Sequence, residues 1–114
     1  MAIDRNLLFL THIIECIDKL EIITKDLYYG DYIKDWLKQD AIIRNVEVIG
    51  EAISNIDDDL KSKYPEVPWK EAKGMRNVLI HEYFKIDYDE VWGTLQEDIP
   101  ALKRMIEKII KDIK

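Results

Sequence analysis

Apolar residues recur at spacings of three and four along most of the chain, which is the period of an amphipathic α-helix. The first such stretch begins after Asp4, a residue able to cap a helix, and runs towards Tyr28 before Gly30. A second helix is predicted from about Tyr32 to Ile56. The predicted inner faces are Leu7, Leu10, Ile14, Ile17 and Leu20 in the first helix, and Ile42, Val46, Ile49, Ile53 and Ile56, widened by Trp36 and Ile43, in the second.

The pattern then breaks at SNIDDDLKSKYPEVP, where acidic residues and two prolines predict a loop. Pro68 suits the first turn of a third helix, because its fixed φ fits a helix and its missing N–H is not needed there. This helix is predicted from Trp69 to about Phe84. Gly74 lies inside it and weakens it unless another element packs closely at that point.

After a short KIDYDE connection, a last apolar stripe comprises Val91, Leu95, Ile99, Leu102, Ile106, Ile109 and Ile113. Pro100 falls in its middle, so this helix is predicted either to kink or to restart with Asp98 as its cap. Amphipathic helices with short connections predict an all-α fold, an antiparallel four- to five-helix up-down bundle in one domain over residues 1–114. So small a bundle leaves much apolar surface to cover, which favours a homodimer.

Composition narrows the class of protein. Cys16 is the only cysteine, which excludes an intrachain disulfide and favours a reducing, cytoplasmic compartment. Apolar runs are too short for a membrane span. The formal net charge of −6 argues against a protein that coats nucleic acid nonspecifically, since such binding depends on an excess of Lys and Arg. Two histidines without a close cluster make a zinc site improbable, and neither a metal nor a cofactor is expected.

One stretch, GMRNVLIHEYF at residues 74–84, stands out chemically. Its surroundings, residues 70–85, carry a net charge of +2 in an otherwise acidic chain. A histidine such as His81 can act as general base or acid in metal-free RNA cleavage, taking the proton of a ribose 2′-OH or protonating the 5′-oxygen. Arg76 can offer paired donors to the phosphate oxygens as charge builds in the transition state. Asn77 could orient the phosphate, and Tyr83 could stack or hydrogen-bond.

The spacing of these residues raises a geometric problem. Each residue of a regular helix turns by ~100°, so Arg76 and His81, five apart, diverge by ~140°. Tyr83 shares a face with Arg76, and Asn77 shares one with His81. The imidazole and guanidinium meet only if the helix distorts near His81, or if a twofold partner brings the same helix alongside. On spacing alone, a structural hydrogen-bonded pair is the commoner explanation.

Other polar groups give weaker signals. His12 lies among apolar neighbours and fits a boundary position better than a ligand. The acidic run Asp57, Asp58 and Asp59 could attract a cation, but such loop residues are usually solvated.

The chain nevertheless resembles a known family over nearly its whole length. RNVLIHEY matches R-x-x-x-x-H-x-Y, the motif of the HEPN superfamily in its HepT-like branch. Further features match the family in the same order. They are IGEA at Ile49–Ala52, the VPW and GMRN blocks within Val67–Tyr83, ID–Y–VW at Ile86–Trp92, and a proline within the last helix. The short motif is weakly specific and the extended block is highly specific.

The resemblance implies an all-α homodimer with the motif in a cleft at the dimer interface. It implies a metal-independent ribonuclease toxin, neutralised by a minimal nucleotidyltransferase antitoxin that transfers AMP to the motif tyrosine. Carried over, Arg76 and His81 would be catalytic and Tyr83 the AMP acceptor. We add Asn77 and Lys73 as substrate-binding candidates, and Glu51 as a residue that could orient Arg76 or simply pair at the surface.

Two alternatives stay open at this point. One is a noncatalytic subunit that binds a nucleotide or substrate, or acts as a scaffold, for a separate nucleotidyltransferase. The other is a plain dimeric helical interaction module. Net acidity and the single histidine of the motif are compatible with both.

Overall fold

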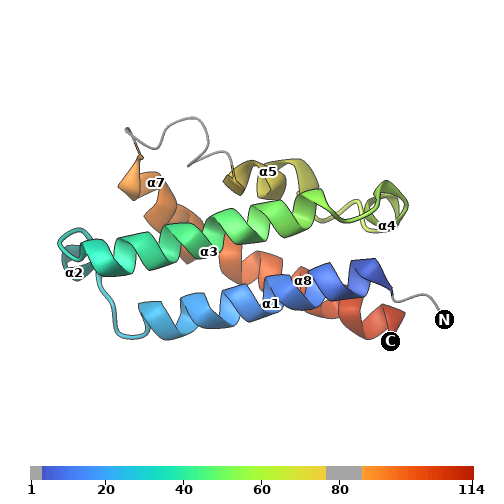
Figure 1. Cartoon of the computed structure of the whole chain (residues 1–114), viewed down its shortest axis with the longest axis horizontal. Helices are drawn as coiled ribbons and strands as arrows, with labels where there is room; N and C mark the ends of the chain where they lie inside the picture. Colours follow the sequence, from blue (N-terminus) through green and yellow to red (C-terminus); the bar gives the residue numbers. More distant parts are fainter. Residues whose placement is uncertain (1–3, 77–85) are drawn as a thin grey trace.

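The structure, a computed structural model of the whole chain, describes residues 4–76 and 86–114. Within these ranges every regular element is helical, as predicted. The long helices α1 (Arg5–Thr24) and α3 (Trp36–Ser54) run antiparallel, and α8 (Ile99–Ile113) lies beside α1. The start of α1 and the end of α8 lie at the same end of the bundle (Figure 1). The predicted number of helices and the homodimer remain predictions.

Helix α1 begins directly after Asp4, as predicted. The Asp4 carboxylate accepts a hydrogen bond from the Leu7 backbone N–H at 3.2 Å, so Asp4 is the predicted cap. The buried face is Leu10, Ile13, Cys16, Ile17 and Leu20. Leu7 and Ile14, predicted on this face, are only half-buried. The predicted end at Tyr28 is wrong, because the helix stops at Thr24 and Asp26 adopts a positive φ of 57°.

The predicted second helix is split. A single turn, α2 (Tyr29–Tyr32), comes first, and α3 begins only after Asp35, whose carboxylate accepts from the Lys38 N–H at 3.1 Å. The predicted inner face of α3 is confirmed from Ile42 to Ile53, including Ile43. Trp36 does not widen it, since the indole at the first turn of α3 is 66% exposed.

The predicted loop after α3 contains a short helix, α4 (Asp58–Lys63). Asp58 and Asp59 occupy its first turn and Lys61 and Lys63 its last, which matches the helix dipole at both ends. Leu60 buries its side chain in the core. The charged residues at its two ends and the buried Leu60 therefore stabilise α4. The helix is too short to show a periodic apolar pattern in the sequence.

The last helical segment is continuous through Pro100. It comprises α7 (Tyr88–Gly93), a π-helical turn η2 (Thr94–Asp98) and α8. The Ile99 N–H donates to the Thr94 carbonyl, five residues back. Proline lacks an N–H and crowds the carbonyl four residues earlier, and the wider π turn accommodates both effects. Asp98 does not act as a cap, because its backbone is helical and its side chain makes no capping bond.

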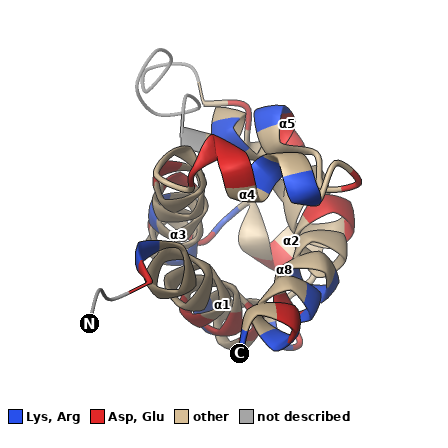
Figure 2. Ribbon diagram, turned by 90° about the vertical axis from the view of Figure 1, so that its right-hand side faces the viewer, with Lys and Arg blue, Asp and Glu red and all other residues tan. Residues whose placement is uncertain are grey.

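The buried apolar residues of the three long segments form one cluster that also includes Tyr32, Leu60, Val67 and Ala72. At the α2 end, the rings of Tyr32 and Trp92 lie 4.7 Å apart between centroids, and those of Tyr29 and Trp92 lie 6.0 Å apart. Charged residues of both signs are interspersed around the bundle (Figure 2). None of the described helices is both long and apolar enough to cross a bilayer.

Candidate functional site

Helix α5 (Trp69–Lys73) carries the chain into the predicted catalytic motif. Its start is fixed by Trp69, whose indole N–H donates to the Tyr64 carbonyl at 2.9 Å. Ala72 is buried, and α5 packs against α3. The position of the first motif residue is therefore set by a short, anchored helix on the long core helix α3.

At Gly74 the α-helix gives way to a 3₁₀ turn, η1 (Gly74–Arg76). Gly74 is expected to weaken the helix unless another element packs closely there, and in the described ranges nothing lies within 4 Å of where a Cβ would stand. The regular α-helix ends at this point. The Gly74 φ of −62° and ψ of −17° are accessible to any residue. The described part of the predicted third helix thus tightens before Arg76 instead of continuing as a regular α-helix.

Most of the predicted site residues in the motif lie outside the described residues. Asn77, His81 and Tyr83 belong to the range 77–85, and of Arg76 only the backbone, at the end of η1, is described. The meeting of Arg76 with His81 therefore stays a prediction, as do the roles of Asn77 and Tyr83.

Lys73 and Glu51 are the two predicted site residues whose surroundings are described. Lys73 ends α5 and is exposed, three residues before Arg76. Glu51 is exposed on α3, and its backbone carbonyl accepts hydrogen bonds from the side chains of Ser54 (2.6 Å) and Asn55 (2.8 Å). Its predicted pairing with Arg76 stays a prediction.

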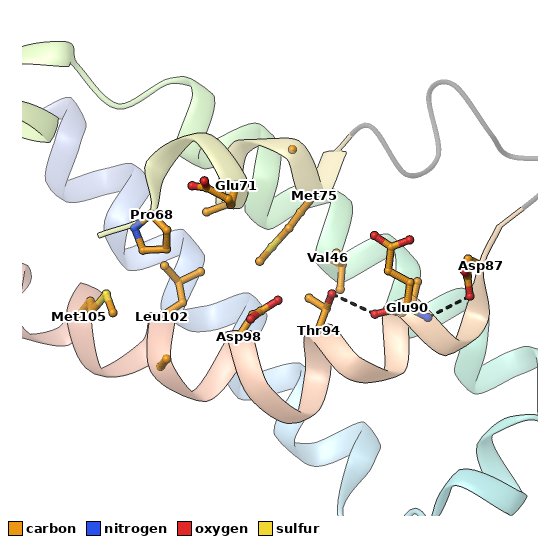
Figure 3. Close-up of a pocket in the computed structure, with 14 residues that line it drawn as sticks. Val46, Pro68, Glu71, Met75, Asp87, Glu90, Thr94, Asp98, Leu102 and Met105 are labelled. Carbon is orange, nitrogen blue, oxygen red and sulfur yellow. Dashed lines mark hydrogen bonds between the residues drawn. The ribbon is translucent and has the colours of Figure 1, made fainter. Parts of the chain in front are cut away.

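A groove of about 730 Å³ runs between α5–η1 and the α7–η2–α8 segment (Figure 3). Its apolar lining is Val46, Pro68, Ala72, Met75, Val91, Ala101, Leu102 and Met105, and its acidic lining is Glu71, Asp87, Glu90 and Asp98. Gly74 and Thr94 complete it. We call this feature the acidic groove, because no Lys, Arg or His is among these fourteen residues.

The electrostatics of the acidic groove differ from those predicted for the motif segment. The carboxylates of its described lining repel phosphate groups. The described residues contain no group of three or more His, Cys, Asp or Glu that could hold a metal ion. Positive charge beside the acidic groove comes from α5, where Lys70 and Lys73 are exposed.

Sequence reasoning missed the acidic groove. Glu90, Thr94 and Asp98 follow one another at intervals of four, a spacing that places them on one side of a helical segment. Glu71 and Met75 are four apart on the facing segment. That periodicity was a usable signal, but only the folded chain shows that the two sides face each other.

Comparison with known proteins identifies the family. A model of the family described as "Ribonuclease HepT-like" matches residues 13–109. The chain belongs to the HepT-like ribonuclease family. A "Putative RNase" of Methanocaldococcus jannaschii is 46% identical to it over 105 residues, which cover 92% of this chain and 87% of that relative.

Two further relatives come from other organisms. A "Probable ribonuclease HepT" of Thermococcus cleftensis is 44% identical over 103 residues, covering 90% of this chain and 94% of the relative. A "Putative RNase" of Caldanaerobacter subterraneus is 37% identical over 103 residues, covering 90% and 92%. No solved structure gives a significant match.

Proposed function

We propose that this protein is a metal-independent endoribonuclease that acts as the toxin of a toxin–antitoxin pair. The observation that carries the proposal is family membership over residues 13–109 combined with an intact Arg76–His81–Tyr83 motif. The names of the relatives, "Putative RNase" and "Probable ribonuclease HepT", support the substrate class.

In the proposed reaction, His81 serves as general base or acid and moves a proton at the ribose 2′-OH or at the leaving 5′-oxygen. Arg76 places its guanidinium on the nonbridging oxygens of the phosphate, where negative charge builds in the transition state. Lys73 and Asn77 hold the RNA strand beside them. Because five residues separate Arg76 and His81, we propose that a homodimer completes the site.

The proposed regulation is covalent. A cognate minimal nucleotidyltransferase transfers AMP from ATP to Tyr83: the phenol oxygen bonds to the α-phosphorus, pyrophosphate leaves and the phenol proton is released. The added phosphate and its bulk, placed two residues from His81, then exclude RNA by like-charge repulsion and by occupying the site.

The experiment is RNA cleavage by the purified protein in the presence of a chelator. His81→Ala should abolish cleavage. His12→Ala is the matched control, because His12 is the other histidine of the chain and is exposed on α1. Unchanged cleavage by His81→Ala, or loss on chelation, would contradict the mechanism.

The dimeric site has its own test. Inactive Arg76→Ala and His81→Ala proteins are mixed, unfolded and refolded together. If the two residues act across a twofold interface, mixed dimers regain part of the activity. No regain would place both residues of each site on one protomer.

Transfer of radiolabelled AMP that is lost in Tyr83→Phe but kept in Tyr28→Phe would support the acceptor assignment.

A noncatalytic subunit of a nucleotidyltransferase complex is the second candidate function. The acidic groove favours it, because a carboxylate-lined surface beside Arg76 suits a protein partner better than an RNA strand. Under this function, no RNA is cleaved under any condition, while the nucleotidyltransferase still binds.

A further inference from the structure

We propose that the acidic groove is a docking site for a cationic amphipathic helix of a partner protein. The inference does not depend on ribonuclease activity. It rests on the apolar floor of the groove, on the charge at its edges and on its length.

The floor has the character of a helix-binding surface. Val91, Leu102 and Ala72 are buried beneath it, and the flexible thioether side chains of Met75 and Met105 line its two sides (Figure 3). Methionine adapts its shape to different apolar partners and is frequent at surfaces that accept amphipathic helices. The floor therefore offers an apolar strip to one face of a partner.

The described lining of the acidic groove carries four carboxylates and no Lys, Arg or His. Glu71, Glu90 and Asp98 make no salt bridge with any residue in the described ranges, and all three are exposed. Asp87 is already engaged, since its carboxylate accepts from the Asp89 and Glu90 N–H groups and caps α7. Carboxylates around an apolar surface attract a ligand of complementary, positive charge.

The dimensions suit a helix. The groove follows the chain from Asp87 to Met105, which corresponds to ~27 Å at a rise of ~1.5 Å per residue. A partner helix with apolar residues at i, i+3, i+4 and i+7 would place them on the floor. Lysines or arginines flanking that stripe would reach the carboxylates at the edges. An RNA strand does not fit this chemistry, because its phosphates would meet the same carboxylates.

The probe is a synthetic sixteen-residue helical peptide with a leucine stripe flanked by lysines. Two control peptides have the same composition in scrambled order, or glutamate in place of lysine. The chain contains three methionines, and Met75 and Met105 lie on opposite sides of the groove. Carbon-13 labelling of methionine methyl groups therefore reports directly on occupancy of the groove by NMR, and fluorescence anisotropy gives the Kd.

We expect the lysine peptide to shift the methyl signals of both groove methionines, and both control peptides to leave them unchanged. The double substitution Glu90→Lys with Asp98→Lys should weaken binding at least about tenfold. The matched control is Glu97→Lys with Glu107→Lys, which makes the same change in net charge at exposed positions of the same helical segment outside the groove. It should change the Kd by no more than about twofold.

Several outcomes would overturn the proposal. If the two double substitutions weaken binding of the lysine peptide equally, binding reflects the net charge of the protein and not the groove. Binding of the scrambled peptide would also show that charge alone suffices. Shifts of Met75 and Met105 caused by an RNA oligonucleotide would assign the groove to nucleic acid, and shifts that grow with protein concentration alone would assign it to a second copy. If the lysine substitutions unfold the chain, Glu90→Gln with Asp98→Asn must still weaken binding.

Discussion

The Tyr32 hydroxyl donates a hydrogen bond to the backbone carbonyl of Tyr88 at 2.7 Å, joining two turns that are 56 residues apart in the chain. Tyr32 is fully buried, and its own carbonyl accepts from the Gln39 side chain at 3.0 Å. The contact therefore fixes α2 and the start of α7 to each other and to α3. Because Asp87 and Glu90 belong to this end of α7, the same contact positions one end of the acidic groove.

Tyr32→Phe should lower the free energy of unfolding by about 1 kcal/mol, because the Tyr88 carbonyl loses its donor while ring packing on Trp92 is kept. Urea unfolding followed by circular dichroism measures the change. Tyr28→Phe is the control: Tyr28 is 73% exposed, and its substitution should change stability by much less. Equal effects at both positions would show that the hydrogen bond contributes little.

Stability should also fall in alkaline solution because of Tyr32. Burial, reinforced by nearby Tyr88 and Asp89, raises the pKa of the Tyr32 phenol from 10.0 to about 12. Below pH 10 the phenol is protonated in both states. Between pH 10 and 12 the unfolded chain loses this proton while the folded chain keeps it, so the free energy of unfolding falls as pH rises.

For Tyr32, this difference amounts to about 1 kcal/mol between pH 9 and pH 11. Tyr32→Phe lacks the titrating group, so its stability should fall less over the same interval. Parallel curves for the two proteins would contradict the assignment.

Hydrophobic periodicity predicted the long helices because each of them buries one face whose apolar residues recur every three or four positions. Ile42, Val46, Ile49 and Ile53 are four or three residues apart, and all are buried as predicted. The same reasoning failed at α2. There Tyr32 is buried by Trp92 and by a bond to Tyr88, contacts that no local pattern contains. Long-range contacts override local periodicity wherever an element is only one turn long.

The candidate site was predictable in part. The family resemblance followed from the extended motif, and the family match confirmed it. The acidic groove could not be predicted, because it depends on Glu71 facing Glu90 and Asp98 across two segments. It also depends on a π turn before Pro100, where the sequence predicted only a kink or a restarted helix. The pairing of Arg76 with His81 stays a prediction, because only the backbone of Arg76 is described and His81 lies outside the described ranges.

The start of α3 should depend on Asp35. Its carboxylate accepts from the Lys38 N–H at 3.1 Å, so Asp35→Ala should destabilise the protein by about 1 kcal/mol. Asp40→Ala removes an equal charge from an exposed position inside the same helix and should be close to neutral. Thermal unfolding of the two variants compares them directly. A larger loss in Asp40→Ala would refute the capping role.

Cys16 should be unreactive in the folded protein. The side chain is 3% exposed, and burial raises the pKa of its thiol, so both access and the thiolate fraction are low. A disulfide reagent such as dithionitrobenzoate should react at least about 100-fold more slowly with the folded chain than with the chain in concentrated urea. Similar rates in the two conditions would mean that α1 opens readily from the core.

Lys73 should contribute one phosphate contact if the proposed RNA site is correct. In a His81→Ala background, which binds RNA without cutting it, Lys73→Ala should weaken binding of a single-stranded oligonucleotide. The slope of log K against log salt should decrease in magnitude by about 0.7, the value for one released counterion. Lys111→Ala, exposed on α8, is the control and should leave the slope unchanged. An equal decrease in both variants would mean that RNA samples the whole surface, whereas a change confined to Lys73 would place the strand beside η1.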